Sequence, residues 1–282
     1  MINTLILKSI SDSFKEDIGD GDHSSLACVP KYALGKAKLL VKDDGILAGL
    51  DIAKLVFSHY DQEIRFTQFL NDGDKIKHGD IAFEVEGSSL SILACERLAL
   101  NIMQRMSGIA TKTAQVVQIL EGTTTKLLDT RKTTPNFRVF EKEAVRIGGG
   151  HNHRFALYDM VMLKDNHIDY AGGINQALTK TNKYLQSIGK NLKIIIEVRD
   201  FNELNQALNH GGFDRVMLDN FTPNELTKAL RIIDNRFETE ASGGITESTI
   251  RAYAETGVDY ISMGALTHQI KSLDLSLKAI DV

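Results

Sequence analysis

Tryptophan is absent from the 282-residue sequence, and proline and cysteine are scarce, with three and two residues. So little proline excludes a proline-rich linker. Cys28 and Cys95 are far apart and form no Cys-x-x-Cys pair, which excludes a disulfide framework and a zinc knuckle and is typical of a reducing cytosol. We therefore expect two buried free thiols in a cytoplasmic protein.

Long apolar runs and an excess of positive charge are also missing. No run approaches the roughly 18 apolar residues of a membrane span, and the N-terminal segment lacks the basic region and cleavage site of a signal peptide. A net charge of −4 argues against a nucleic-acid-binding protein. The composition, 43% hydrophobic and 25% charged, is typical of one large or two smaller globular domains.

The first 90 residues predict a strand-rich segment. Residues 36–50 alternate and carry Asp-Gly at 44–45, which predicts a hairpin. Further turn signals stand at 72–73 and 78–79. Apolar residues at helical spacing then predict a helix over 91–120.

Gly108 stands within that helical pattern. Glycine is a poor helix former, so we expect it to end or kink the helix.

From about residue 125, short apolar runs alternate with helical patterns. The runs are 126–129, 159–164, 193–198, 215–219, 237–242 and 258–264. The helical patterns are 174–189, 201–212, 222–234 and 246–257. Repeated strand–helix units predict a parallel sheet with crossover helices. Because the late strands end at intervals of 22 or 23 residues, we favour a β/α barrel, incomplete with only six strands.

The carboxyl ends of barrel strands carry the chemistry of such folds. Here each predicted strand ends in polar residues or glycine, and the last two loops, 241–245 and 263–266, are glycine-rich. Glycine lets backbone N–H groups approach an anion closely, so these loops predict a phosphate site. Glu197 and Asp219 end neighbouring strands and predict bound Mg²⁺, held directly or through water.

Positive charge gathers at the same strand ends. These groups predict a ligand with several negative charges, and they are Arg131, Lys132, His153, Arg154, Lys164 and His167. Three alternatives stay open: a metal at His151-x-His153, a Schiff-base aldolase using Lys164, and a non-catalytic sensor of a phosphate ligand.

In order from about residue 16 to the C-terminus, the chain resembles the quinolinate phosphoribosyltransferases, also called carboxylating nicotinate-nucleotide pyrophosphorylases. The segments that carry the resemblance are ERLALNIMQRMSGIAT (96–111), LLDTRKTTP (127–135), EKEAVRIGGGHNHR (141–154), LYDMVMLKDNHI (157–168), IIEV (195–198), VMLDNF (216–221), EASGGI (240–245) and MGALTH (263–268). DTRKTTP, GGGHNHR and KDNH together are far more specific than a lone glycine motif.

The resemblance implies an α/β protein. An N-terminal α/β sandwich domain would span 1–112, joined by the C-terminal segment 268–282, and an open β/α barrel of the type II phosphoribosyltransferases would span 113–267. The implied reaction converts quinolinate and phosphoribosyl pyrophosphate to nicotinate mononucleotide, pyrophosphate and CO₂ with Mg²⁺, in de novo NAD synthesis. The implied assembly is a homodimer with shared active sites, or a higher oligomer of dimers.

The resemblance also implies roles for single residues. Quinolinate would contact Arg131, His153, Arg154, Lys164 and, from the partner subunit, Arg97. Lys132 would lie near pyrophosphate and quinolinate, and His268 near the pyrophosphate end. Glu197 and Asp219 would hold Mg²⁺ through water and the ribose hydroxyls. The 5′-phosphate would be received by Ser242, Gly243, Gly244, Gly264 and Ala265.

Two positions depart from the family pattern. Asn136 stands where glycine is usual, and asparagine tolerates a left-handed backbone. Arg199 stands where an acid is usual, and it could point into the barrel or lie on an outer helix face. His151, Asp165 and His167 stay open between ligand contact and support of other ligands. A relative associated with molybdenum transport is the alternative within this scaffold.

Overall fold

The structure is a computed structural model that describes residues 2–280; Met1 and the last two residues of the predicted segment 268–282 lie outside it. Contacts divide the chain into two compact units. Unit 1 holds Met1–Gln115, Lys132–Gly149 and Leu266–Val282, and unit 2 holds Val116–Arg131 and Gly150–Ala265. The domain boundary between residues 112 and 113 stays a prediction. No helix within residues 2–280 is long and apolar enough to cross a membrane.

Unit 1 is built around a four-stranded antiparallel sheet in the order β12-β1-β5-β3. Its strands are β1 (Leu34–Val41), β3 (Arg65–Gln68), β5 (Ile81–Ser88) and β12 (Leu275–Ile280). Its helices are α1 (Ile2–Ile18), α2 (His23–Cys28), α3 (Leu50–Tyr60), α4 (Ser89–Ile119), α5 (Arg138–Ile147) and α11 (Ala265–His268), of which α4 ends and α11 begins in unit 2. Helix α3 packs on the sheet through Phe57, whose ring contacts Phe66 and Phe83.

The hairpin predicted at 44–45 is wrong. Strand β1 pairs with β5 on one side and with β12 on the other, while β2 (Gly45–Ile46) pairs with β4 (Lys75–Ile76). The neighbours of β1 are therefore β5 and the C-terminal strand β12, and not the segment directly after the turn, as the local signal predicted. The turns at 72–73 and 78–79 are present, each with a glycine at positive φ.

The helix end expected at Gly108 is also wrong, because α4 continues from Ser89 to Ile119. The alternative of a kink stays a prediction. A Cβ atom at Gly108 would lie 2.3 Å from the carbonyl oxygen of Lys271. Glycine is therefore required here for close backbone packing rather than for a helix end.

The two cysteines differ in burial. Cys95 is buried as expected, and this burial raises the pKa of its thiol to about 12. Cys28 is exposed, so the expectation of a buried thiol is wrong there. It ends α2, a short helix of which only Ser25 is buried.

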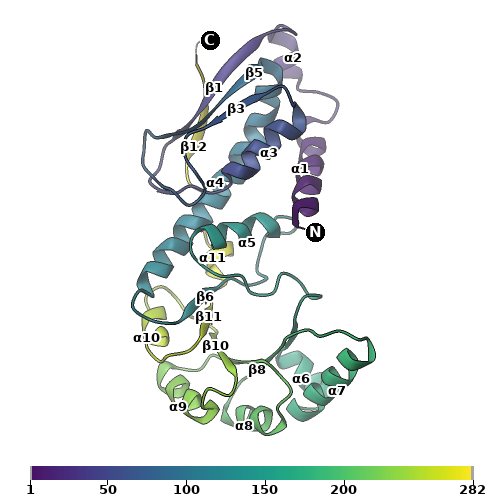
Figure 1. Cartoon of the computed structure of the whole chain (residues 1–282), viewed down its shortest axis with the longest axis vertical. Helices are drawn as coiled ribbons and strands as arrows, with labels where there is room; N and C mark the ends of the chain where they lie inside the picture. The colour runs from purple at the N-terminus through teal and green to yellow at the C-terminus, as the bar shows by residue number, and fades with distance from the viewer. Residues whose placement is uncertain (1, 281–282) are drawn as a thin grey trace. The chain divides into compact units, whose positions relative to one another are not determined.

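Unit 2 contains the six predicted parallel strands in the order β6-β11-β10-β9-β8-β7, which confirms an open barrel (Figure 1). The strands are β6 (Lys126–Leu128), β7 (Val161–Leu163), β8 (Ile194–Val198), β9 (Arg215–Asp219), β10 (Glu238–Ser242) and β11 (Tyr260–Ser262). Helices α6 (Asp165–Ala171), α7 (Ile174–Ser187), α8 (Phe201–His210), α9 (Pro223–Ile233) and α10 (Ile250–Ala254) follow strands of this sheet. His151 bridges Leu128 in parallel and extends the sheet beyond β6.

The strand register arranges the two faces of this sheet differently. One face holds apolar side chains such as Val198 and Leu218, which are fully buried. The other face holds the alternate side chains, among them Arg215, Met217 and Asp219 of β9, which pair in register with Glu238, Glu240 and Ser242 of β10.

Candidate active site

All six strands of unit 2 run parallel, so their carboxyl ends meet at one edge of the sheet, called here the mouth. The residues within or just beyond these ends are Arg131, Lys164, Glu197, Asp219, Ser242 and Gly264. The structure therefore brings the predicted acids, cations and glycine loops of unit 2 to the same edge.

Lys164 and Glu197 form an ion pair at the mouth. The Lys164 Nζ lies 2.6 Å from Glu197 Oε2, with the lysine side chain 44% exposed and the glutamate side chain 7% exposed. Lys164 directly follows β7 and serves as the N-cap residue of α6. This ion pair occupies the Lys164 Nζ, whereas a Schiff-base lysine must present a free amine to its substrate. The geometry therefore disfavours the aldolase alternative.

Asp219 lies beside this ion pair at the end of β9. Burial, followed by the negative charge of Glu197, raises the pKa of Asp219. The Asn220 amide donates to Asp219 Oδ2 at 2.7 Å. The capping box of Thr222 and Glu225 starts α9 directly afterwards, which fixes this strand end. Two neighbouring carboxylates in a partly buried place form a site that favours a cation.

The glycine loop after β10 packs against Asn220. The Asn220 main-chain N–H donates to the carbonyl oxygen of Ser242, and Asn220 has φ 58°. Gly243 has φ 94°, and a Cβ atom there would lie 2.2 Å from Asn220 Oδ1. A side chain at Gly243 would therefore displace Asn220, which orients Asp219.

Arg131 and Arg154 bring two guanidinium groups to the mouth. Burial, followed by the positive charge of Arg131, lowers the pKa of Arg154. The Arg154 guanidinium donates to the carbonyl oxygen of Met160 at 3.2 Å. Two cations held close enough to repel each other favour an anionic ligand between them.

The loop that carries His153 is anchored to β6. The carboxylate of Asp129, which is fully buried, accepts a hydrogen bond from the His153 main-chain N–H at 2.8 Å. The His153 ring is buried and faces Glu240, which lies at the middle of β10. Sequence reasoning missed Glu240; the available signal was an acid at the centre of a strand between buried residues.

Comparison with known proteins identifies the family. The profile of the quinolinate phosphoribosyl transferase N-terminal domain matches residues 22–107, and that of the C-terminal domain matches residues 109–278. This chain is a member of the quinolinate phosphoribosyltransferase family. The resemblance noted in the sequence and the expected fold class are both confirmed.

Relatives of this phosphoribosyltransferase match along most of its length. It is 42% identical to quinolinate phosphoribosyltransferase [decarboxylating] 1b of Nicotiana tabacum, over 94% of this chain and 80% of that protein. It is 41% identical to the probable nicotinate-nucleotide pyrophosphorylase [carboxylating] of Bacillus subtilis, over 98% and 94%. The crystal structure of NadC from Streptococcus pyogenes superposes with a TM-score of 0.90 at 39% identity, covering 97% of this chain and 96% of that one.

Three predicted site residues of this phosphoribosyltransferase belong to unit 1, namely Arg97, Lys132 and His268. All three are exposed. The Lys132 carbonyl oxygen accepts a hydrogen bond from Thr267 Oγ1 at 2.7 Å.

Sequence reasoning missed a buried ion pair next to this segment. Arg105 of α4 donates to Glu141, which is fully buried, and to the Thr267 carbonyl oxygen. Glu141 also accepts from the N–H and hydroxyl of Thr134. The pair therefore holds the segment after Lys132 in place.

The open questions about single residues have structural answers. Arg199 donates hydrogen bonds to Glu203 on α8 and Asp169 on α6, and these hydrogen bonds raise the pKa of Arg199. Asn136 has φ 61°, which confirms that asparagine adopts the left-handed conformation here. His167 Nδ1 accepts the Lys164 main-chain N–H, so this histidine caps α6.

His151 is exposed, and its main chain bonds with Leu127 and Asp129. The Asp165 carboxylate accepts from the N–H of Asn166. Within residues 2–280, no three His, Cys, Asp or Glu side chains are grouped as metal ligands.

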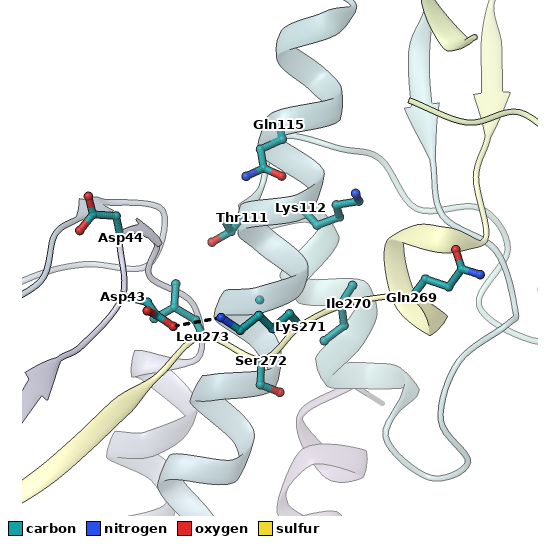
Figure 2. A pocket seen from close by; sticks show the side chains of 11 residues that line it. Asp43, Asp44, Thr111, Lys112, Gln115, Gln269, Ile270, Lys271, Ser272 and Leu273 are labelled. Carbon is teal, nitrogen blue, oxygen red and sulfur yellow. Dashed lines mark ion pairs between the residues drawn. The ribbon is translucent and has the colours of Figure 1, made fainter. Parts of the chain in front are cut away.

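A separate cavity of about 490 Å³ lies in unit 1 beside α4 (Figure 2). Thr111, Lys112 and Gln115 of α4 line one side of it. Lys271 lies 4.0 Å from Asp43 across it, but the lysine side chain is 90% exposed. None of the predicted site residues lines this cavity, so it is separate from the site at the mouth.

Proposed function

We propose that this protein transfers the phosphoribosyl group of phosphoribosyl pyrophosphate to quinolinate with decarboxylation, giving nicotinate mononucleotide, pyrophosphate and CO₂. The observation that carries the proposal is the meeting of guanidinium groups, an ammonium group and paired carboxylates at one mouth. Such a mouth suits an acceptor with two carboxylates and a donor that is a phosphorylated sugar. We place the reaction in the cytoplasm, within de novo NAD synthesis.

The acceptor would lie against the cations. Arg131 and Arg154 would each bind a carboxylate of quinolinate through paired N–H donors. Lys164 would bind the acceptor from the neighbouring strand end. Because Lys164 is already paired with Glu197, acceptor binding would loosen that pair and free Glu197 for the donor.

The donor would lie across the acids and the glycine loops. Glu197 and Asp219 would bind the ribose hydroxyls. The backbone N–H groups of Ser242, Gly243 and Gly244, with those of Gly264 and Ala265, would receive the 5′-phosphate. Gly243 approaches Asn220 too closely for any side chain, so this loop would leave its main chain open to the phosphate.

Mg²⁺ fits the acidic pair. Burial and then the negative charge of Glu197 raise the pKa of Asp219, and Mg²⁺ is often held by one or two carboxylates together with water and substrate phosphates. Glu197 and Asp219 would hold it, and it would supply charge neutralisation of the pyrophosphate. Removal of Mg²⁺ with EDTA should abolish turnover, and added Mg²⁺ should restore it.

The chain's own residues would act mainly by orientation and charge. Contacts from Arg131 and Arg154 would aim the pyridine nitrogen at the anomeric carbon as pyrophosphate leaves. The carboxylates of Glu197 and Asp219 would stabilise positive charge on the ribose ring. After transfer, the positive charge of the pyridinium nitrogen stabilises the electron pair left on the adjacent C2 when its carboxylate leaves as CO₂. A proton then adds to C2, so no separate electron sink is needed.

The resemblance supplies the remaining roles. Lys132 and His268 would contact pyrophosphate, and Arg97 would act at the mouth of the partner subunit in a homodimer or an oligomer of dimers. Subunit complementation tests this assembly. Mixed Arg97→Ala and Arg131→Ala subunits should regain about a quarter of wild-type activity, because a mixed dimer with shared sites has one intact site. No gain over the separate variants would contradict shared sites.

The deciding experiment is an assay with quinolinate, phosphoribosyl pyrophosphate and Mg²⁺ that measures CO₂ and nicotinate mononucleotide together. Equal amounts of both products, with nicotinate inert as the control acceptor, are expected. Donor binding without any product would retain the phosphate site but overturn quinolinate as the acceptor.

A further inference from the structure

The interior of the barrel holds a buried cluster of charged groups that the proposed chemistry does not use. Glu240 lies at the middle of β10 and is 0% exposed. Its Oε2 lies 3.0 Å from an Arg215 guanidinium nitrogen and 3.4 Å from His153 Nε2. Charged side chains are seldom buried to this degree unless they are paired. The cluster connects the core of the barrel with the loop that carries Arg154.

The tautomer of His153 follows from its second ring contact. The main-chain N–H of Arg154 points at His153 Nδ1 at 2.7 Å. A main-chain N–H can only donate, so Nδ1 is the acceptor and carries no hydrogen. The hydrogen of the neutral imidazole is then on Nε2, the nitrogen that faces Glu240.

We propose that Glu240 is a positioning residue for binding of the acceptor: it holds His153 as the Nε2-protonated tautomer, and Nδ1 then fixes the main chain of Arg154. The inference rests on the proposed function of Arg154. It gives His153 a further role, the support of Arg154.

The surroundings of the cluster suit this role. Asp129 holds the His153 main chain, and the Met160 carbonyl oxygen holds the Arg154 guanidinium. Burial alone would raise the pKa of Glu240, but its contact with His153 and the charge of Arg215 outweigh this and lower it. Glu240 therefore stays an acceptor, and the Nε2 hydrogen of His153 faces a carboxylate.

The first test compares Glu240→Gln with Glu238→Gln. Both acids contact Arg215, but Glu238 is partly exposed and does not face His153. A glutamine amide can donate to His153 Nε2, so it no longer enforces the tautomer. We expect Glu240→Gln to raise KM for quinolinate by roughly tenfold to 100-fold, the size of effect known for residues that orient a binding side chain. Glu238→Gln should leave it within about twofold, and neither variant should change KM for phosphoribosyl pyrophosphate.

Equal losses in both variants, or equal losses for both substrates in Glu240→Gln, would assign Glu240 a purely structural role and overturn the proposal. An unchanged KM for quinolinate in folded Glu240→Gln would overturn it as well.

The second test uses the wild-type protein and stays decisive if Glu240→Gln does not fold. ¹⁵N NMR of histidine-labelled protein, with the His153 signals assigned by their loss in His153→Gln, reports the tautomer directly. A protonated Nε2 with a bare Nδ1 at neutral pH is expected. A doubly protonated ring or a protonated Nδ1 would overturn the proposal. This measurement needs no turnover, so its failure is distinct from failure of the proposed function, which the product assay reports.

Discussion

The Nζ of Lys164 and the Oε2 of Glu197 lie 2.6 Å apart, and the pair joins the two halves of the proposed site. Lys164 follows β7 on the side of the acceptor, whereas Glu197 lies in β8 next to Asp219 on the side of the donor. The Lys164 side chain of this pair is 44% exposed to solvent, and the Glu197 side chain is 7% exposed. A pair with a buried member is weak evidence for stability, because the desolvation of its charges can exceed their Coulombic attraction. The pair is therefore better explained by catalysis than by folding.

Replacement of Lys164 separates these two explanations. Lys164→Met should lower kcat/KM for quinolinate by about 10²–10³-fold, because an ammonium group at the reacting centre is lost. The free energy of unfolding in urea should also fall, by up to about 3–5 kcal/mol, because the buried Glu197 carboxylate loses its partner. The control is Lys36→Met, which removes a lysine paired with Glu84 on the unit 1 sheet and should leave kcat/KM unchanged. A large loss of stability with a small loss of activity would assign Lys164 a structural role.

Arg131→Ala tests the guanidinium pair. Loss of one bidentate arginine should lower kcat/KM by about 10²–10³-fold or more, equivalent to about 3–4 kcal/mol of transition-state stabilisation. Arg146→Ala is the matched control, since Arg146 is an exposed arginine paired only locally with Glu143. Steady-state kinetics with both substrates varied gives the result. Near-normal turnover of Arg131→Ala would remove this residue from the site.

The barrel could be predicted from the sequence because its signals are local. Each strand is a short apolar run, and each helix after β8 and β9 begins at a capping residue, Asp200 or Thr222. The strand ends then follow by geometry, since parallel strands share one carboxyl edge. Glu197 and Asp219 were placed correctly at that edge for this reason.

The features that sequence reasoning missed depend on partners far along the chain. β12 pairs with β1 across more than 200 residues of sequence, and no turn residue encodes that pairing. A glycine such as Gly108 is typical of a helix end, but here it allows the main chain of Lys271 to pack closely against the helix. The Glu240–His153 contact joins a strand centre to a distant loop, and an isolated glutamate gives no periodic signal for it.

Stability at low pH should depend on Asp72, which accepts the Leu50 and Asp51 main-chain N–H groups at the start of α3. Burial raises the pKa of Asp72 in the folded chain above its ordinary value of 3.8. The folded state then binds the proton more tightly, so the free energy of unfolding from this group falls as pH rises from below 3.8 through the folded pKa. Asp72→Asn keeps one acceptor and removes the charge.

We therefore expect Asp72→Asn to be at least as stable as wild type at pH 7, with the difference shrinking as the pH falls towards 3.8. Asp72→Ala should lose about 1 kcal/mol at both pH values, because the cap is lost. Urea unfolding at several pH values measures both. A difference between Asp72→Asn and wild type that grows as the pH falls would show that the pKa shift has the opposite sign.

Gly243→Ala tests whether the loop after β10 controls the donor half of the site through Asn220. An added Cβ would collide with Asn220 Oδ1 at 2.2 Å and with its main-chain nitrogen at 2.8 Å. Asn220 donates to Asp219, so the collision should disturb the acid that binds the ribose. KM for phosphoribosyl pyrophosphate should rise about tenfold or more, because a misplacement of about 1 Å can cost 10²-fold. Gly257→Ala is the control, with a similar φ of 87° and open space around its Cβ. Gly257→Ala should cost about 1 kcal/mol of stability and leave KM for phosphoribosyl pyrophosphate unchanged. Equal effects of both variants on this KM would mean that backbone strain, not the Asn220 contact, governs donor binding.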